Sequence, residues 1–119
     1  MKINNDHIIK YHFRAICVPL HIVQKYQKLM PDIKIEHCKW KHGSGEVMLI
    51  ELTSKKVCKL LLKTIKSSPL SCEFGLWVEM ITEYDHDGLR APLYISDFYC
   101  KVGGRLDFFF TCLPSSPDG

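Results

Sequence analysis

Three short stretches of the sequence carry residue types that could do chemistry. His37, Cys38 and His42 lie within HCKWKH, and imidazole and thiolate groups are the ligands that zinc prefers. On a strand, however, His37 and Cys38 point to opposite faces, and zinc sites usually pair ligands two to four residues apart and add a second pair. The stretch fits the end of a strand in a hairpin better than a metal site. We therefore expect no metal ion and no other cofactor.

Acid–base chemistry would need a histidine beside carboxylates, as in Asp85, His86 and Asp87. Turns favour Asp and Gly for backbone reasons alone, so this stretch equally predicts a turn. Asp107 could pair with Arg105, two residues earlier on the same strand face. No cysteine lies in the exposed, electropositive setting that a thiolate nucleophile requires. We therefore expect a protein that is not an enzyme.

A run of lysines without acidic residues marks the second expected helix. Its members are Lys55, Lys56, Lys59, Lys63 and Lys66. Like charges four residues apart destabilise a helix slightly, and a merely solvated face usually mixes signs. This face is a candidate for binding an acidic protein or a phosphate backbone, with a simple solvated face as the alternative. Lys41 and His42, in the loop between two expected strands, complete the candidate partner-binding residues.

The length and amino-acid composition of the chain indicate a soluble globular protein. The chain has 119 residues, 46% of them hydrophobic and 24% charged, a composition unlike that of a disordered chain. We expect one domain, residues 1–119, with loose ends at 1–6 and 114–119. No apolar run reaches the roughly 18–20 residues that cross a bilayer, and the start lacks a signal-peptide pattern. We therefore expect no membrane contact and a cytoplasmic location.

The net charge bears on nucleic-acid binding, and the spacing of the cysteines bears on disulfide bonding. A formal charge of +3 is below that of a dedicated nucleic-acid binder and excludes an acidic nucleic-acid mimic. The six cysteines show no C-x-x-C spacing, and most fall within apolar periodic stretches. We expect them to be reduced packing residues and not disulfide partners. They are Cys17, Cys38, Cys58, Cys72, Cys100 and Cys112.

Hydrophobic periodicity predicts five strands and three helices. The strands are expected over 9–17, 33–40, 46–52, 72–83 and 106–112, and the helices over 20–30, 55–66 and 92–102. In the first strand, Ile9, Tyr11, Phe13, Ala15 and Cys17 form the expected apolar face. The order is β-α-β-β-α-β-α-β, and its first six elements match the split βαβ arrangement. The predicted fold class is α+β, a ferredoxin-like βαββαβ antiparallel sheet extended by a C-terminal helix and strand.

The C-terminal module is the clearest part of the pattern. Pro92 suits the first turn of a helix, and Gly103-Gly104 ends it. The following strand has apolar residues on both faces, so we expect it inside the sheet and not at its rim. Trp77 and Phe109 fall on the face opposite the core. We expect them to form a second layer under the last helix, with an exposed aromatic patch for a protein partner as the alternative.

This module also resembles a known family. The matching residues are Leu76-Trp77-Val78, Asp87-Gly88-Leu89, Pro92-Leu93 and Val102-Gly103-Gly104-Arg105-Leu106-Asp107-Phe108. The stretch from Phe74 to Cys112, about a third of the chain, is similar to small bacterial domains that occur as immunity proteins beside polymorphic or contact-dependent toxins. The resemblance implies a protein that binds and blocks a partner without chemistry of its own. No functional residue is carried over with it.

The sequence is compatible with two functions. The first is a cytoplasmic immunity protein that neutralises a cognate toxin through protein–protein contact, with the basic helix meeting an acidic toxin surface. The alternative is a small nucleic-acid-binding ferredoxin-like domain that uses the same lysines on phosphates. RNA recognition through the sheet itself would require exposed aromatic residues on central strands. Here Asp107 lies among the aromatic residues and would repel phosphate.

Overall fold

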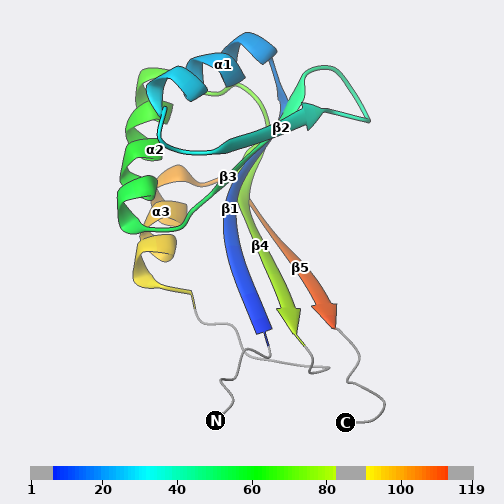
Figure 1. Ribbon diagram of the computed structural model, residues 1–119, viewed down its shortest axis with the longest axis vertical. Helices are drawn as coiled ribbons and strands as arrows, with labels where there is room; N and C mark the ends of the chain where they lie inside the picture. The colour runs from blue at the N-terminus through cyan, green and yellow to red at the C-terminus, as the bar shows by residue number, and fades with distance from the viewer. Residues whose placement is uncertain (1–6, 83–90, 113–119) are drawn as a thin grey trace.

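Five strands and three helices alternate along the chain in the computed structural model, which describes residues 7–82 and 91–112 (Figure 1). They are β1 (His7–Val18), α1 (Leu20–Leu29), β2 (Ile35–Lys39), β3 (Glu46–Glu51), α2 (Lys55–Ser67), β4 (Phe74–Thr82), α3 (Leu93–Val102) and β5 (Arg105–Cys112). The α+β class is confirmed. The expected loose ends and the acidic turn at 84–88 lie outside the described residues. Among the described helices, none combines the length and hydropathy needed to cross a membrane.

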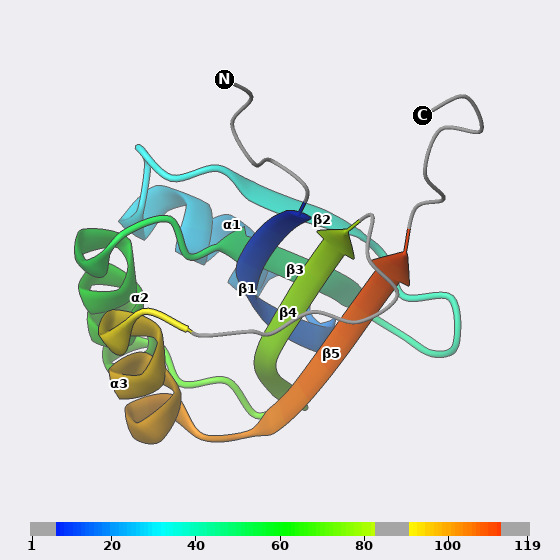
Figure 2. The same ribbon diagram turned by 90° about the horizontal axis from the view of Figure 1, so that it is seen from below.

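The strands form one sheet in the order β2-β3-β1-β4-β5. β1 pairs with β3 and β4, and β2 pairs with β3, all antiparallel, whereas β5 runs parallel to β4. The predicted hairpin between β2 and β3 is thus confirmed. All three helices cover the same face of the sheet, and no described element covers the other face (Figures 1 and 2). We call this second face the open face.

The prediction that β5 lies inside the sheet is wrong, because β5 is an edge strand. Apolar residues on both of its faces suggested burial on both sides. Instead Leu106 and Phe108, on the helix side, stay 43% and 59% exposed, and Phe109 on the open face is 53% exposed. The centre of the sheet is β1, although Lys10, His12 and Arg14 alternate with its apolar residues, a pattern typical of a half-buried strand. Hydrophobicity along one strand does not show how many neighbours the strand has.

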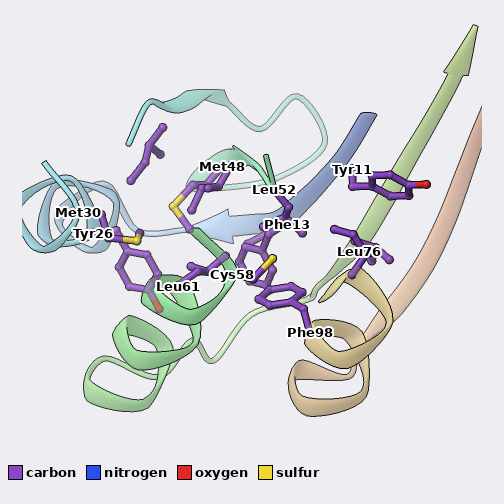
Figure 3. Close-up of a cluster of buried hydrophobic side chains, with 14 of the residues drawn as sticks. Tyr11, Phe13, Tyr26, Met30, Met48, Leu52, Cys58, Leu61, Leu76 and Phe98 are labelled. Atoms are coloured by element: carbon purple, nitrogen blue, oxygen red, sulfur yellow. The ribbon is translucent and has the colours of Figure 1, made fainter. Parts of the chain in front are cut away.

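The hydrophobic core lies between the helix layer and the inner face of the sheet (Figure 3). Phe13 of β1 is fully buried and meets Phe98 of α3 edge to face, with ring centroids 6.1 Å apart. Tyr26 of α1 is also fully buried and donates its hydroxyl proton to the Ser68 carbonyl oxygen at 2.7 Å, which ties α1 to the end of α2. The three helices are therefore held on one shared core.

A bulge in β1 overturns one of the predicted core positions. The pairing of β1 with β3 shifts between Ala15 and Val18, and Cys17 has a φ of 61°. The extra residue turns Cys17 out to solvent and places Val18 in the core instead. A side chain at Gly45 would collide with the backbone of the bulge, so the hairpin packs directly against it.

Capping residues define the ends of α2 and α3. The Ser54 hydroxyl accepts a hydrogen bond from the Val57 N–H at 3.3 Å at the start of α2. Gly103 and Gly104 have φ values of 69° and 87° after α3, the left-handed region that glycine tolerates. The three- and four-residue spacing of the apolar residues in α3 predicts a buried stripe of Leu93, Ile95, Phe98, Tyr99 and Val102. The prediction is wrong at Leu93, which is 82% exposed.

Candidate basic surface

The five lysines predicted on the second helix all lie on α2 with exposed side chains: Lys55, Lys56, Lys59, Lys63 and Lys66. None of them forms an ion pair with a carboxylate among the described residues. Lys55 and Lys56 lie in the first turn, where the helix dipole favours negative charge and disfavours lysine. Helix stability therefore does not explain why these lysines are there.

Charge is unevenly divided between the three helices and the rest of the chain. The three helices hold eight lysines and one carboxylate, Asp97, a net charge of +7, whereas the remaining sequence holds eight basic and twelve acidic residues. The added lysines are Lys25 and Lys28 of α1 and Lys101 of α3, and all three are exposed. The modest total charge of +3 thus conceals a strongly basic helix layer. Such a surface attracts anionic partners and accelerates their association.

A groove with an apolar floor runs between α2 and α3. Three lysines from both helices and one carboxylate, Asp97, line it together with Cys58, Leu62, Tyr94 and Phe98. Farther along, Leu62, Lys66, Lys101 and neighbouring side chains border a hollow of about 430 Å³. Lysine ammonium groups therefore rim a partly apolar surface, so that a partner could bury apolar side chains while its carboxylates meet the rim.

The other two candidate residues lie elsewhere. Lys41 and His42 are exposed in the loop between β2 and β3, and this loop projects from the side of the molecule opposite α2 in both views (Figures 1 and 2). The rings of Trp40 and His42 meet edge to face, with centroids 5.1 Å apart. The backbone N–H of Trp40 donates to the Gly45 carbonyl oxygen at 3.0 Å. The structure gives the loop a defined shape but does not bring it to the lysines of α2.

The histidines of the HCKWKH stretch are separated. His37 Nδ1 lies 2.7 Å from Glu46 Oε1 across the hairpin, and Cys38 faces the opposite side of β2, as strand geometry requires. Within the part of the chain that the structure describes, no three potential ligands gather into a group that could hold a metal ion. The Asp85, His86 and Asp87 turn lies outside that part.

The predicted pairing of Arg105 with Asp107 is confirmed, with their side chains 3.3 Å apart. Arg105 also meets Glu73 at 2.8 Å, a partner that sequence reasoning missed because it comes from the loop before β4. The two carboxylates raise the pKa of Arg105, mainly through its hydrogen bond to Glu73. This arrangement joins the start of β5 to the start of β4 and leaves no net positive charge at Arg105.

An aromatic cluster lies on the open face, where we had expected a layer under the last helix. Trp77 is next to Phe109, with ring centroids 5.9 Å apart, and the Arg14 guanidinium lies 5.4 Å from the Trp77 ring centre. His12 lies on the same face and is only 9% exposed, and its Nδ1 has no hydrogen-bond partner among the described residues. The prediction of a second layer under α3 is wrong, because α3 covers the other face.

The cysteines are less buried than predicted. Five are described and free, but only Cys58 is buried, and burial raises its pKa to about 11. Cys17, Cys38 and Cys100 are exposed, so the expectation that most cysteines serve packing is wrong for these three. Cys112 has no described side chain.

Comparisons of the chain with family models, with curated proteins and with solved structures found no match in any of the three.

Proposed function

We propose that this protein is a non-catalytic binding protein of the immunity type, which neutralises a bacterial toxin in the cytoplasm by covering an acidic toxin surface. The observation that carries the proposal is the charge segregation, with eight lysines and one carboxylate on the three helices. The lysines are exposed, and those of α2 have no carboxylate partner among the described residues. A partner with matching negative charge would supply the missing counter-charges.

The fold lends support to the family part of the proposal. The first four strands lie in the order β2-β3-β1-β4 with antiparallel neighbours, and we assign this arrangement to the ferredoxin-like class. β5 and α3 then extend it, as the resemblance to small immunity domains implies. In this proposal the helix layer makes the contact, and the groove between α2 and α3 receives apolar side chains of the toxin.

The same observation also suits a phosphate backbone, which makes nucleic-acid binding the alternative function. Lys59, Lys63 and Lys66 follow one another at helical spacing, and lysines on a helix can contact successive phosphates. The two functions differ in their salt dependence and in what is bound. Binding of generic RNA would weaken steeply between low and moderate salt.

The first experiment is affinity capture of the tagged full chain from its native host, with one sample treated with ribonuclease before capture. A single stoichiometric protein that survives the ribonuclease treatment supports the immunity function. RNA that disappears after the treatment supports the alternative. A bare chain in both samples from cells that express the neighbouring toxin genes would contradict both proposals.

Variants then locate the surface. Lys59→Glu should slow association with the captured partner by about 3–10-fold at low salt, because charge complementarity acts mainly on the association rate. Lys10→Glu changes the net charge equally at an exposed position on the open face of β1, outside the candidate binding residues, so it is the matched control. Equal slowing by both variants would indicate a net-charge effect, and unchanged kinetics for Lys59→Glu would remove α2 from the interface.

A further inference from the structure

The outer edge of β5 offers main-chain groups for a further strand. β5 spans Arg105–Cys112 and pairs with β4 on one side, and no described strand pairs with its other side. An open strand edge presents a row of N–H and C=O groups that favours pairing with another chain. Native proteins usually protect such edges with charged residues, with proline or with a short strand.

The opposite edge of the sheet has this protection, and β5 does not. β2 is five residues long, and only Ile35 of it is buried. Its exposed Glu36 and Lys39 place charges along that edge. In β5 the charges are confined to Arg105 and Asp107, and the sequence FFFTC follows without a charge or a proline. The two edges therefore differ in the features that prevent strand pairing.

The side chains beside the β5 edge are apolar on both faces of the sheet. Phe108 lies on the helix side, where with Leu106 it lines an apolar cleft of about 210 Å³ below α3. Phe109 lies on the open face beside Trp77. Since a phenylalanine buries about 150–250 Å² when enclosed, Phe108, Phe109 and Leu106 together leave roughly 300 Å² of apolar surface for a partner.

The charge at this edge permits two copies to meet. Arg105 lies between Glu73 at 2.8 Å and Asp107 at 3.3 Å, and this cluster, with one excess negative charge, is at the start of β5. When two β5 strands pair antiparallel, the two clusters lie at opposite ends of the interface, so their like charges stay apart. Seven of the eight lysines of the helix layer lie on α1 and α2, whereas α3, which carries Lys101 and Asp97, lines the same apolar cleft as Leu106 and Phe108. Beyond this cluster, residues 108–112 carry no charge, so a strongly charged partner finds nothing to match along them, whereas a second copy offers the same apolar edge.

We propose that two copies of this chain pair through antiparallel β5 strands about a two-fold axis, which joins their sheets into one of ten strands. The axis stands perpendicular to the sheet, so both helix layers lie on the same side of the joined sheet. The dimer thereby presents the two basic surfaces together and leaves them free. This inference goes beyond the proposed function and does not depend on it. The apolar area per copy is below the roughly 800 Å² of a standard stable interface, so the dimer should dissociate on dilution.

The test is sedimentation velocity of the full chain in reducing buffer, from about 1 to 300 µM. The expected result is a mass that rises from the chain mass of 13.8 kDa toward twice that value. A mass of 13.8 kDa at every concentration overturns the proposal. Hydrogen exchange on the same samples should show slower exchange of β5 amides at high concentration, and slowing confined to other elements also overturns it.

Two variants and a matched control locate the interface. Phe109→Lys should shift dimerisation to at least tenfold higher concentration, and Phe108→Lys repeats the test from the other face. Ile8→Lys introduces the same charge at a position that is 50% exposed on the open face but lies on β1. This control should still dimerise. If Ile8→Lys abolishes the dimer as well, the open faces stack on each other and edge pairing is wrong. Circular dichroism confirms that each variant is folded.

Discussion

Substitution of Tyr26 by phenylalanine tests the link between α1 and α2. The Tyr26 hydroxyl donates to the Ser68 carbonyl oxygen at 2.7 Å, and both residues are buried. Phenylalanine keeps the ring but leaves this carbonyl without its partner. A hydrogen bond contributes about 0.5–1.5 kcal/mol net and a buried group without a partner costs about 1–3 kcal/mol, so we expect Tyr26→Phe to lower the free energy of unfolding by about 1.5 kcal/mol.

The pH dependence of the free energy of unfolding provides a second, independent test of this prediction. Burial raises the pKa of Tyr26 from 10.0 to about 12. The stability that the neutral hydroxyl contributes is complete below pH 10 and is lost as the pH rises toward 12, because the unfolded chain ionises first. At a pH of about 11, ionisation of Tyr26 should have lowered the free energy of unfolding of the native protein by roughly 1.4 kcal/mol. The phenylalanine variant has no such group and should lose none of its stability in this way. The stability difference between the two proteins should therefore vanish near that pH.

Urea unfolding at pH 8, 9, 10 and about 11 measures both effects, with a midpoint shift of roughly 0.5–1.5 M at pH 8. Tyr99→Phe is the matched control, because its hydroxyl donates to the Gly104 carbonyl oxygen at 3.2 Å in an exposed position. It should cost less than about 0.5 kcal/mol. Equal costs for the two variants, or a Tyr26→Phe difference that stays constant up to pH 11, would refute the reasoning.

Two further predictions concern the glycine pair after α3 and the buried thiol. Alanine at Gly103 or Gly104 carries a backbone penalty of about 1–3 kcal/mol for its positive φ, but only at Gly104 would the new methyl group collide with the Phe74 carbonyl oxygen. Urea unfolding should therefore show Gly104→Ala as the more destabilising by at least about 1 kcal/mol, and the reverse order would contradict the geometry. At pH 8, iodoacetamide should alkylate the exposed Cys100 about 100-fold faster than Cys58, whose pKa is raised to about 11 by burial. Peptide mass mapping measures the rates, and similar rates would show that α2 opens readily.

The sequence alone determined the elements and their caps. Alternating or helically spaced apolar residues mark each strand and helix because local geometry sets these periods. The Gly103-Gly104 pair ends α3 as predicted, and Ser54 caps the start of α2, since capping involves only neighbouring residues. The lysines of α2 were identified for the same reason: their spacing on a helix places them on the surface whatever packs beneath.

The tertiary structure alone decided which strand is central and which face of the sheet the helices cover. The position of β5 at the rim depends on its pairing with β4, and such pairings join residues far apart in the chain. The bulge at Cys17 arises where β1 pairs with β3, and the local sequence pattern does not predict it.

The basic character of the helix layer also emerged only in three dimensions. Lys25 and Lys28 of α1 and Lys101 of α3 are distant in sequence from the lysines of α2, and only the shared core brings the three helices onto one face. Periodicity determines which way a side chain points along its own element. Which elements become neighbours is set by burial and pairing over the whole chain, and the candidate binding surface and the exposed β5 edge are both consequences of that step.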